Sequence, residues 1–567
     1  MMLASARRCS FALALASLGL VAVFATRAAR ADDQVIHLTG DVPMDDSSFL
    51  FLPFEVPAGT AEIEVKHSDL SSKNILDWGL NDPNGYRGWG GGKSADAIVG
   101  VDAASPSYAP GPLPAGTWQV VIGKAQILDP PGQYDVTITL RTEPTLAPQT
   151  ERAPYEPPAP LSSDARWYAG DLHMHTIHSD GTPTVEELAV LAEQRGLDFI
   201  EVSDHNNVTQ LDYYKEVQAR HPTVLLIPGE EWTTYEGHAN AIGVTRVVPF
   251  TLGVDGVTAN VAADDTHAQG GLFSINHPTL DLGDACIGCA WTQPIDPFKV
   301  DAVEIENGAY SKYGQLFYEK NLAFWDGLLD SGAHIAAVGG SDDHKGAHAS
   351  GFTESVIGRP TTMVYASELS VAAIVDGIKH HRTVVKLDDV DDPMIELRAD
   401  GELPDGGTIE AASMTLSVHV EGAMGGEVRL YKNGAALADV VAVDSGDFTH
   451  DIVVDAPPSG EDRYRAELSV GGQPAAVTSH VWIARPATPP DAGVPDAGAP
   501  DAGLPDAGLA DAGVQDAGVQ DAGVTSPPVG ASGGCAIAAP GAERGRGWPA
   551  LALALSFFAL GWTRRRL

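Results

Sequence analysis

The sequence predicts an α/β protein in which a β/α barrel is flanked by two β-sandwich domains. Three observations predict this fold. Short apolar runs between turn signals fill residues 32–145, strands alternate with amphipathic helices over 166–390, and alternating strand patterns return over 391–485. Regular strand–helix alternation is typical of a parallel sheet, whereas many short strands without a helical period are typical of a sandwich.

Residues 1–31 have the pattern of a secretory signal peptide. Two arginines precede an apolar run over 11–25, and Ala29 and Ala31 are the small residues expected before a cleavage site. The alternative is a membrane anchor, for which the run is short. We therefore expect an exported protein.

The N-terminal sandwich is predicted over 32–145. Polar and apolar residues alternate from Glu62 to Val65, and two longer alternating runs cover 116–122 and 134–140. The following segment, 146–165, is rich in proline, and we expect it to be a semi-rigid linker.

The barrel is predicted over 166–390. Thr184 and Glu187 form a capping box at the start of an amphipathic helix that Gly196 ends. Helical segments lie between most of the buried strands that follow, at 198–202, 224–227, 272–275, 302–305 and 334–338. This alternation predicts parallel strands that close into a barrel.

An Ig-like sandwich is predicted over 391–485, where a strand pattern at 414–420 is followed by a hairpin signal at 428–434. Residues 486–532 repeat Asp-Ala-Gly every five residues. Because this repeat has no apolar face and carries one sign of charge, it predicts an extended spacer.

Residues 533–567 form a tail with Cys535, an apolar run from Trp548 to Trp562 and a final arginine cluster. The tail resembles the C-terminal sorting signal of myxobacterial surface proteins. This resemblance implies processing near Cys535 and a location at the cell envelope, either anchored or released. An ordinary C-terminal membrane helix is the alternative. Both place the barrel outside the cytoplasm, with the tail at the membrane.

The charge balance argues against binding of nucleic acid or anionic lipid through a basic patch. The formal net charge is −41, and such an acidic surface repels nucleic acid and anionic lipid. An anionic substrate would need bound cations that reverse the local field.

Cys286 and Cys289 form a CxxC pair. No second such pair is present to complete a zinc site, so in an exported protein we expect a small disulfide loop rather than a zinc knuckle.

The ends of the predicted strands carry metal-type side chains. His173 and His175 are two residues apart, so on a strand they point to the same face. Further clusters follow the next strands, as His178-Ser179-Asp180, Ser203-Asp204-His205, Glu230-Glu231, His238, Asn276-His277-Pro278 and Ser341-Asp342-Asp343-His344. The carboxyl ends of barrel strands converge, which predicts one site. Imidazole with carboxylate suits Zn, Mn or Fe, and the ligands are enough for two or three divalent ions.

The order of these motifs resembles the PHP (polymerase and histidinol phosphatase) superfamily. Gly-Asp-Leu-His-Met-His-Thr with Ser-Asp-Gly and the flanking sandwich is similar to its CehA/McbA-like metallohydrolase branch. The resemblance covers about 165–390 and implies a distorted seven-stranded β/α barrel with a two- or three-metal centre. Carried over motif by motif, it implies the metal ligands His173, His175, Asp180, His205, Glu231, His238, His277, Asp342 and His344. Among these we expect Glu231, His277 and Asp342 to take part directly in catalysis.

Three of these assignments have alternatives. Glu230 competes with Glu231 as the carboxylate that bridges two ions, and Asp343 competes with Asp342. Many members of the family carry a histidine where Asn240 aligns, whereas this chain has His238 on the same strand face. His238 either takes that place or one metal site is altered.

The resemblance implies hydrolysis of a small anionic phosphoester by a hydroxide that bridges the metals. Hydrolysis of a carbamate, ester or amide is the second hypothesis, because the same branch includes such activities. A third hypothesis is a non-catalytic surface module that metal stabilises, although a structural site needs one closed ion and not an open cluster. The side chains that could bind substrate are His178, Lys312, Lys345 and Arg359, and for Arg359 an ordinary surface charge is favoured.

Overall fold

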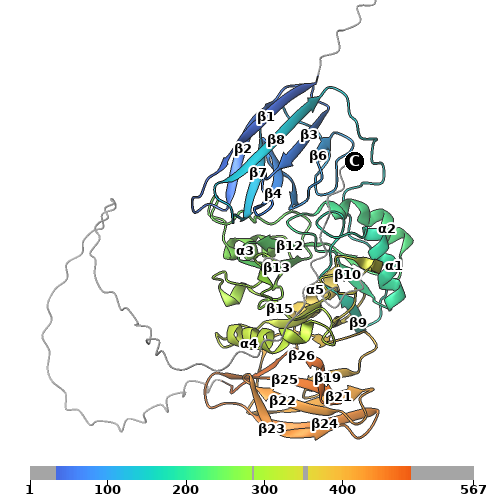
Figure 1. Cartoon of the computed structure of the whole chain (residues 1–567). Coiled ribbons are helices and arrows are strands. Elements are labelled where there is room, and N and C mark those ends of the chain that lie inside the picture. The colour runs from blue at the N-terminus through green and yellow to red at the C-terminus, as the bar shows by residue number, and fades with distance from the viewer. Residues whose placement is uncertain (1–32, 284–285, 349–354, 487–567) are drawn as a thin grey trace, which may run out of the picture. The chain divides into compact units, whose positions relative to one another are not determined.

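The computed structural model describes residues 33–283, 286–348 and 355–486 (Figure 1). The predicted signal peptide, nearly all of the spacer and the whole tail lie outside these residues, so those predictions are not tested. Within the described ranges, no helix is both long enough and apolar enough to cross a membrane.

The N-terminal module, residues 33–145, consists of two four-stranded antiparallel sheets that share one core. Trp118 and Ile63, from different sheets, are both fully buried in that core, as is typical of a sandwich. One sheet has the order β1 (Gln34–Val42), β8 (Gly132–Arg141), β3 (Glu62–Ser68), β6 (Ala97–Gly100), and the other β2 (Phe49–Val56), β7 (Gly116–Gln126), β4 (Ile75–Asp82), β5 (Gly85–Gly91).

The middle region, residues 166–390, contributes strands to two sheets. A five-stranded sheet has the order β12 (Gly229–Thr234), β13 (Gly237–Ile242), β14 (Leu272–Ile275), β15 (Ala302–Asn307), β16 (Ala336–Gly340). The other five strands, in the order β11 (Leu225–Ile227), β10 (Phe199–Glu201), β9 (Arg166–Asp171), β17 (Thr361–Ala366), β18 (Thr383–Lys386), begin an eleven-stranded sheet. Two isolated bridges join the two sheets. Met174, after β9, pairs with Asp343, after β16, and His205, after β10, pairs with Glu231 of β12.

The helices of the middle region are few and short. They are α1 (Val185–Arg195), α2 (Tyr214–Arg220), α3 (Ala259–Ala268), α4 (Tyr318–Leu329) and α5 (Val371–Lys379), with short 3₁₀ turns η1 (Thr209–Tyr213), η3 (Pro297–Lys299), η4 (Gly314–Leu316) and η5 (Gly346–His348). The capping box predicted for α1 is confirmed, because Thr184 accepts from the Glu187 amide and Glu187 accepts from the Thr184 amide. Gly196 ends this helix in the left-handed conformation, also as predicted.

The predicted seven-stranded β/α barrel is wrong. The described residues form 27 strands and only five α-helices, and the strands of the middle region lie in two mixed sheets. β12, β13 and β14 are antiparallel neighbours, and β17 is antiparallel to both β9 and β18. The reason lies in the connections. Two residues join β12 to β13, and such a short link permits only a hairpin, whereas a parallel pair needs a long crossover.

The eleven-stranded sheet continues into the C-terminal region, residues 391–485. β18 pairs with β26 (Gln473–Thr478), and the sheet runs on through β25 (Glu461–Val470), β22 (Glu427–Lys432) and β23 (Ala435–Ala442). β27 (Val481–Ala484) pairs with β25 and with β20 (Thr408–Glu410). A three-stranded sheet of β19 (Met394–Ala399), β21 (Ser413–Glu421) and β24 (Asp447–Asp455) completes the region.

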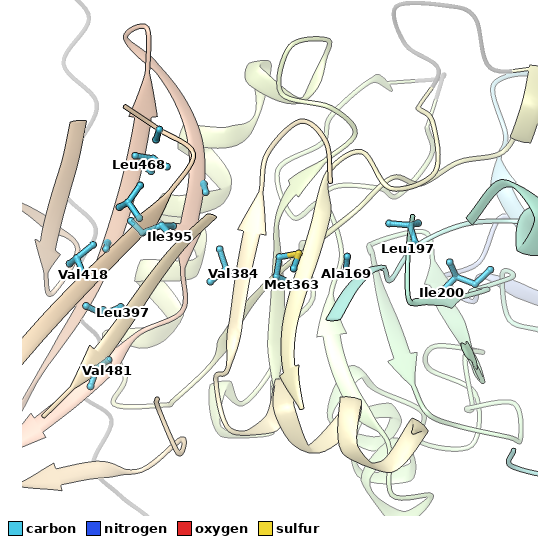
Figure 2. Close-up of a cluster of buried hydrophobic side chains, with 14 of the residues drawn as sticks. Ala169, Leu197, Ile200, Met363, Val384, Ile395, Leu397, Val418, Leu468 and Val481 are labelled. Carbon is cyan, nitrogen blue, oxygen red and sulfur yellow. The ribbon is translucent and has the colours of Figure 1, made fainter. Parts of the chain in front are cut away.

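One hydrophobic core extends across residue 390. Figure 2 shows Ala169, Ile200 and Met363 of the middle region in the same cluster as Ile395 and Leu468 of the C-terminal region. Together with the shared sheet, this core fixes the C-terminal strands to the strands that carry the candidate site.

Candidate metal centre

The nine predicted metal ligands come together from β12, β13 and the segments that follow β9, β10, β14 and β16. They fall into four overlapping groups, and the potential ligand atoms of each group lie within 4.8 Å of one another. We call His175, Asp180, His205 and His344 the outer group, and we call His173, Glu231, His238, His277 and Glu304 the inner group. A fourth set, His173, His175 and Asp342, links the two.

The outer group is built by loops. His205 Nε2 and His344 Nε2 lie 3.3 Å and 3.2 Å from Asp180 Oδ1. The His175 ring stacks on both of these histidines, with ring centroids 4.3 Å from His205 and 4.1 Å from His344. Two of the three imidazoles therefore face one carboxylate oxygen, and the His175 ring stacks on both of them.

Glu231 connects the two groups through its two carboxylate oxygens. Its Oε1 lies 3.3 Å from His173 Nε2, 3.2 Å from His238 Nδ1 and 3.4 Å from His277 Nε2, all in the inner group. Its Oε2 lies 2.6 Å from His205 Nδ1 and 3.7 Å from His175 Nε2 of the outer group. This is the arrangement expected of a carboxylate that bridges two ions.

Asp342 makes the second connection. Its Oδ1 lies 3.0 Å from His175 Nε2, 3.3 Å from His173 Nε2 and 3.6 Å from His344 Nδ1. Asp342 and His277 both have positive φ angles, of 55° and 27°. Such backbone conformations cost about 1–3 kcal/mol each in residues other than glycine and are concentrated at functional sites.

Several histidines are oriented through the nitrogen that faces away from the cluster. Nδ1 of His173 lies 3.1 Å from Glu304 Oε1, and Nδ1 of His277 lies 3.1 Å from the Cys289 carbonyl. Nδ1 of His344 lies 2.9 Å from the Asp342 carbonyl. Metal-binding histidines usually have one nitrogen fixed in this way, which leaves the other nitrogen for the ion.

The donor set fits divalent ions. Two ligands bonded tetrahedrally at about 2.0–2.2 Å lie about 3.4 Å apart, and most of the nitrogen–carboxylate separations given above are close to that value. His173 Nε2 and both nitrogens of His238 are buried without a hydrogen-bond partner, which is costly unless another ligand satisfies them. Burial, together with the charges of His344 and His205, lowers the pKa of His175 to about 3.

The structure shows which carboxylate of each neighbouring pair, Glu230 or Glu231 and Asp342 or Asp343, lies in the cluster. Glu230 turns away from the cluster and accepts from the Val248 amide, and burial raises its pKa to about 8. Asp343 accepts from the amides of Lys345, Gly346 and Ile357, so it holds a loop. Glu231 and Asp342 lie in the cluster.

His238 and Asn240 also have different surroundings. His238 lies beside Glu231 and His277. Asn240 donates to the Leu172 carbonyl at 2.6 Å and accepts from Asn276 Nδ2 at 2.7 Å. Asn276 donates in turn to Glu231 Oε1 at 2.9 Å. Asn240 thus positions Asn276, which donates a hydrogen bond to Glu231.

Sequence reasoning missed Glu304. This residue lies on β15 and is almost fully buried, and its Oε2 accepts from the His277 amide at 2.7 Å while its Oε1 faces His173. A signal was present, because a glutamate inside the apolar run Ala302-Val303-Glu304-Ile305 needs a partner in the core.

A cavity of about 520 Å³ opens onto the cluster. Its lining includes the disulfide formed by Cys286 and Cys289 and the segment from Trp89 to Gly92 of the N-terminal module. The metal-type residues in the lining are Asp180, His205, Glu231, His238, His277, Asp342 and His344. The disulfide expected from the sequence is therefore present. Lys345 is the only lysine or arginine among the described residues of this lining.

The other predicted substrate-binding side chains do not line this cavity. His178 is buried with Nδ1 2.8 Å from Thr209 Oγ1. Arg359 lies 3.1 Å from Asp388 and 3.3 Å from Asp389, as a structural charge would. Lys312 lies on the segment between β15 and α4. Lys345 alone of the four is in place to meet a substrate.

No family model and no curated protein matches the sequence. Among similar solved structures, a two-domain protein from Bacteroides vulgatus, described as containing a predicted PHP-like metal-dependent phosphoesterase, is 17% identical, with 58% of this chain and 99% of that one covered at a TM-score of 0.33. A Bifidobacterium adolescentis protein, provisionally described as a metal-dependent phosphoesterase, is 16% identical over 36% and 94% of the two chains, at a TM-score of 0.23.

A third similar structure is an amidohydrolase from Chromobacterium violaceum, 15% identical over 31% of this chain and 87% of that one, at a TM-score of 0.21. Two of the three descriptions name the class that the sequence resemblance implies. Likenesses this low assign no activity, so the functional argument rests on the geometry of the cluster.

Proposed function

We propose that this chain is a metal-dependent hydrolase of the PHP type, in its CehA/McbA-like branch, and that it acts on a small anionic phosphoester. The observation that carries the proposal is Glu231, whose two oxygens face two different sets of imidazoles. A single closed ion of a structural site would not need such a carboxylate.

The residues of the cluster divide into two sets of metal ligands. The histidines of the inner group and Glu231 would hold one cation, while Glu304 orients His173 and His277. The outer group would hold another cation, and Asp342 lies beside His173 and His175 at the junction of the two groups. Divalent ions of Zn, Mn or Fe suit this mixture of imidazole and carboxylate. When bound, such ions would supply an acidified water and positive charge for the phosphoryl oxygens.

The lining of the cavity favours an anionic substrate only when cations are bound. Asp77, Asp180 and Asp342 make the lining acidic, and Lys345 is its sole full cation among the described residues. Lys345 follows the outer-group residue His344, so its ammonium can attract and orient a phosphoryl oxygen beside the cations. The aspartates would repel the same substrate if the cations were removed.

The proposed location is the cell envelope. A signal peptide over 1–31 would export the chain, and a tail over 533–567 would retain it or be processed near Cys535. The disulfide of Cys286 and Cys289 supports this proposal, because such bonds persist in oxidising compartments. Fractionation of cells that express the full chain tests it, and a purely cytoplasmic protein would contradict it.

A metal and substrate panel tests the activity. The mature chain is stripped with chelator, reloaded separately with Zn²⁺, Mn²⁺ or Fe²⁺, and assayed on p-nitrophenyl phosphate, bis(p-nitrophenyl) phosphate and an aryl carbamate. We expect metal-dependent turnover of a phosphoester, loss of metal in His175→Ala, and no change in His419→Ala, whose histidine lies on β21 in the C-terminal region. Turnover of the carbamate alone would contradict the phosphoesterase and support hydrolysis of a carbamate, ester or amide instead. No turnover, with full metal in His175→Ala, would exclude the enzyme.

A further inference from the structure

The N-terminal module contacts the loop that carries Asp180. Lys93 donates from Nζ to the Ile177 carbonyl and to Ser107 Oγ, the latter at 3.2 Å. Ser107 Oγ donates to the His178 carbonyl at 2.5 Å. Two successive carbonyls just before Asp180 are therefore held by side chains from a different part of the chain.

These contacts are in a buried environment. Ser107 and His178 are buried, and Lys93 is largely covered. Burial lowers the pKa of Lys93, while the charges of Asp204 and Asp180 oppose this effect. Because a covered ammonium is costly without acceptors, separation of the module from the loop would leave Lys93 without the Ile177 carbonyl.

A second contact reaches the neighbouring ligand of the same group. Tyr86 donates its hydroxyl to the Asn206 carbonyl at 2.8 Å. Asn206 follows His205 and has a positive φ of 47°, a conformation that asparagine adopts more readily than most residues.

A third contact holds the turn between β12 and β13, the strands that carry Glu231 and His238. Tyr235 donates to Asp77 Oδ2 at 2.8 Å and stacks on Phe49 with ring centroids 6.1 Å apart. A Cβ at Gly123 would lie 2.1 Å from the Tyr235 hydroxyl, so only glycine leaves room for this ring.

We infer that the N-terminal module is a positioning element of the metal centre, and that Lys93 acts on Asp180 through the Ile177 carbonyl. Asp180 needs such help, because its side chain is 59% exposed and lies on a loop. His173, Glu231 and Glu304 of the inner group lie on strands or directly after a strand end. Loss of Lys93 should therefore weaken the outer group selectively. The inference rests on the proposed metal centre but not on the reaction that it performs.

Stepwise metal binding tests this inference. The mature full-length chain is stripped of metal, and Zn²⁺ binding is followed by calorimetry for the unmodified chain, Lys93→Met and Lys66→Met. Lys66 lies on the same module, is 54% exposed, and pairs with Glu64 and Asp96, so it is the matched control. In Lys93→Met we expect about 10- to 100-fold weaker binding at one site and unchanged binding at the other, the usual effect of a lost outer-shell partner.

Three outcomes decide the inference. Binding in Lys93→Met that equals binding in Lys66→Met would overturn it. Equal weakening of both sites would also overturn it, because that result indicates a general loss of structure. If Lys93→Met does not fold, Ser107→Ala removes the neighbouring bond to the His178 carbonyl, and it must weaken one metal site and leave the other unchanged for the inference to stand.

The same samples separate this inference from the proposed function. An unmodified chain that binds two ions but hydrolyses nothing would contradict the proposed hydrolase and leave the role of Lys93 measurable. An active chain whose metal binding is unaffected by Lys93→Met would contradict only the positioning role.

Discussion

The molecule contains two clusters of histidines that differ in their neighbours. In the metal centre, the imidazoles surround Asp180, Glu231 and Asp342. In the second cluster, where the middle and C-terminal regions meet, His381 and His480 pack against Trp482, with ring centroids 4.8 Å and 5.7 Å away. His480 is buried, and its two ring nitrogens have no hydrogen-bond partner. Burial and the charges of Arg465 and Arg463 lower the pKa of this histidine.

The comparison shows what distinguishes a metal site from a packed core. Converging nitrogens with shared carboxylates can hold cations, whereas histidines packed on indole rings and near arginines are kept neutral by burial. Removal of carboxylate charge should therefore disable the first cluster, and acid should destabilise the second. The predictions that follow test this difference, beginning with the largest effect.

Glu231→Gln should impair the metal centre most, because Glu231 connects the inner group and the outer group. The amide has only one oxygen acceptor for two sets of imidazoles, so we expect both metal sites to weaken and activity to fall by more than the roughly 100-fold typical of outer-shell changes. Metal stoichiometry and turnover measure this effect. Glu230→Gln is the matched control, because an amide oxygen can still accept from the Val248 amide. Equal losses in the two variants would contradict the bridging role.

Asp180→Asn should affect the outer group alone. Asp180 Oδ1 faces only His205 and His344 in the cluster, so we expect about 10- to 100-fold weaker binding of one ion. Because the side chain is exposed, thermal unfolding of the metal-free chain should not change. A loss of both ions would show that the two groups are not separable.

Acid should destabilise the second cluster. Burial lowers the pKa of His381 to about 3 and that of His480 well below its usual value. The unfolded chain takes up protons below about pH 6.5 while these folded histidines do not, so stability falls as the pH drops from about 6.5 towards 3. The expected slope is about 1.4 kcal/mol per pH unit for each histidine.

Urea unfolding of the metal-free chain at several pH values measures this slope. His480→Leu should reduce it, whereas His37→Leu, at an exposed histidine of β1, should not. The same slope in His480→Leu and the unmodified chain would show that His480 does not titrate as its burial requires.

Glu304→Gln should have the smallest effect. Glutamine can still accept from the His277 amide, but it removes the charge beside His173 Nδ1. We expect binding at the inner group to weaken by about tenfold, at the lower end of outer-shell effects. An unchanged inner site would mean that Glu304 serves only to fix the loop at His277.

The sequence predicted which side chains lie together better than it predicted the fold. All nine predicted ligands meet in the structure, and they were taken motif by motif from the resemblance to a known family, which does not depend on the order of the strands. The barrel prediction failed because pairing between strands is not local. Apolar runs identify strands, but the tight turn at Tyr235 and Glu236 decides that β12 and β13 are antiparallel.

Two further features could not be read from residue types alone. Asp342 and Asp343 are chemically identical, and only the amides around Asp343 assign it to a loop rather than to the cluster. Contacts such as Lys93 with Ile177 join residues 84 positions apart. No periodic pattern records such a contact, so the role of the N-terminal module emerged only from the structure.

The sheet that crosses residue 390 has a consequence for proteolysis. A protease that cuts the segment between β18 and β19 would break the chain, but β26 would remain paired with β18 through Val384, Val385 and Lys386. The fragments should therefore migrate together under native conditions and separate only in denaturant. A protein cleaved there would keep its C-terminal strands, so cleavage at this point would be detected only after denaturation.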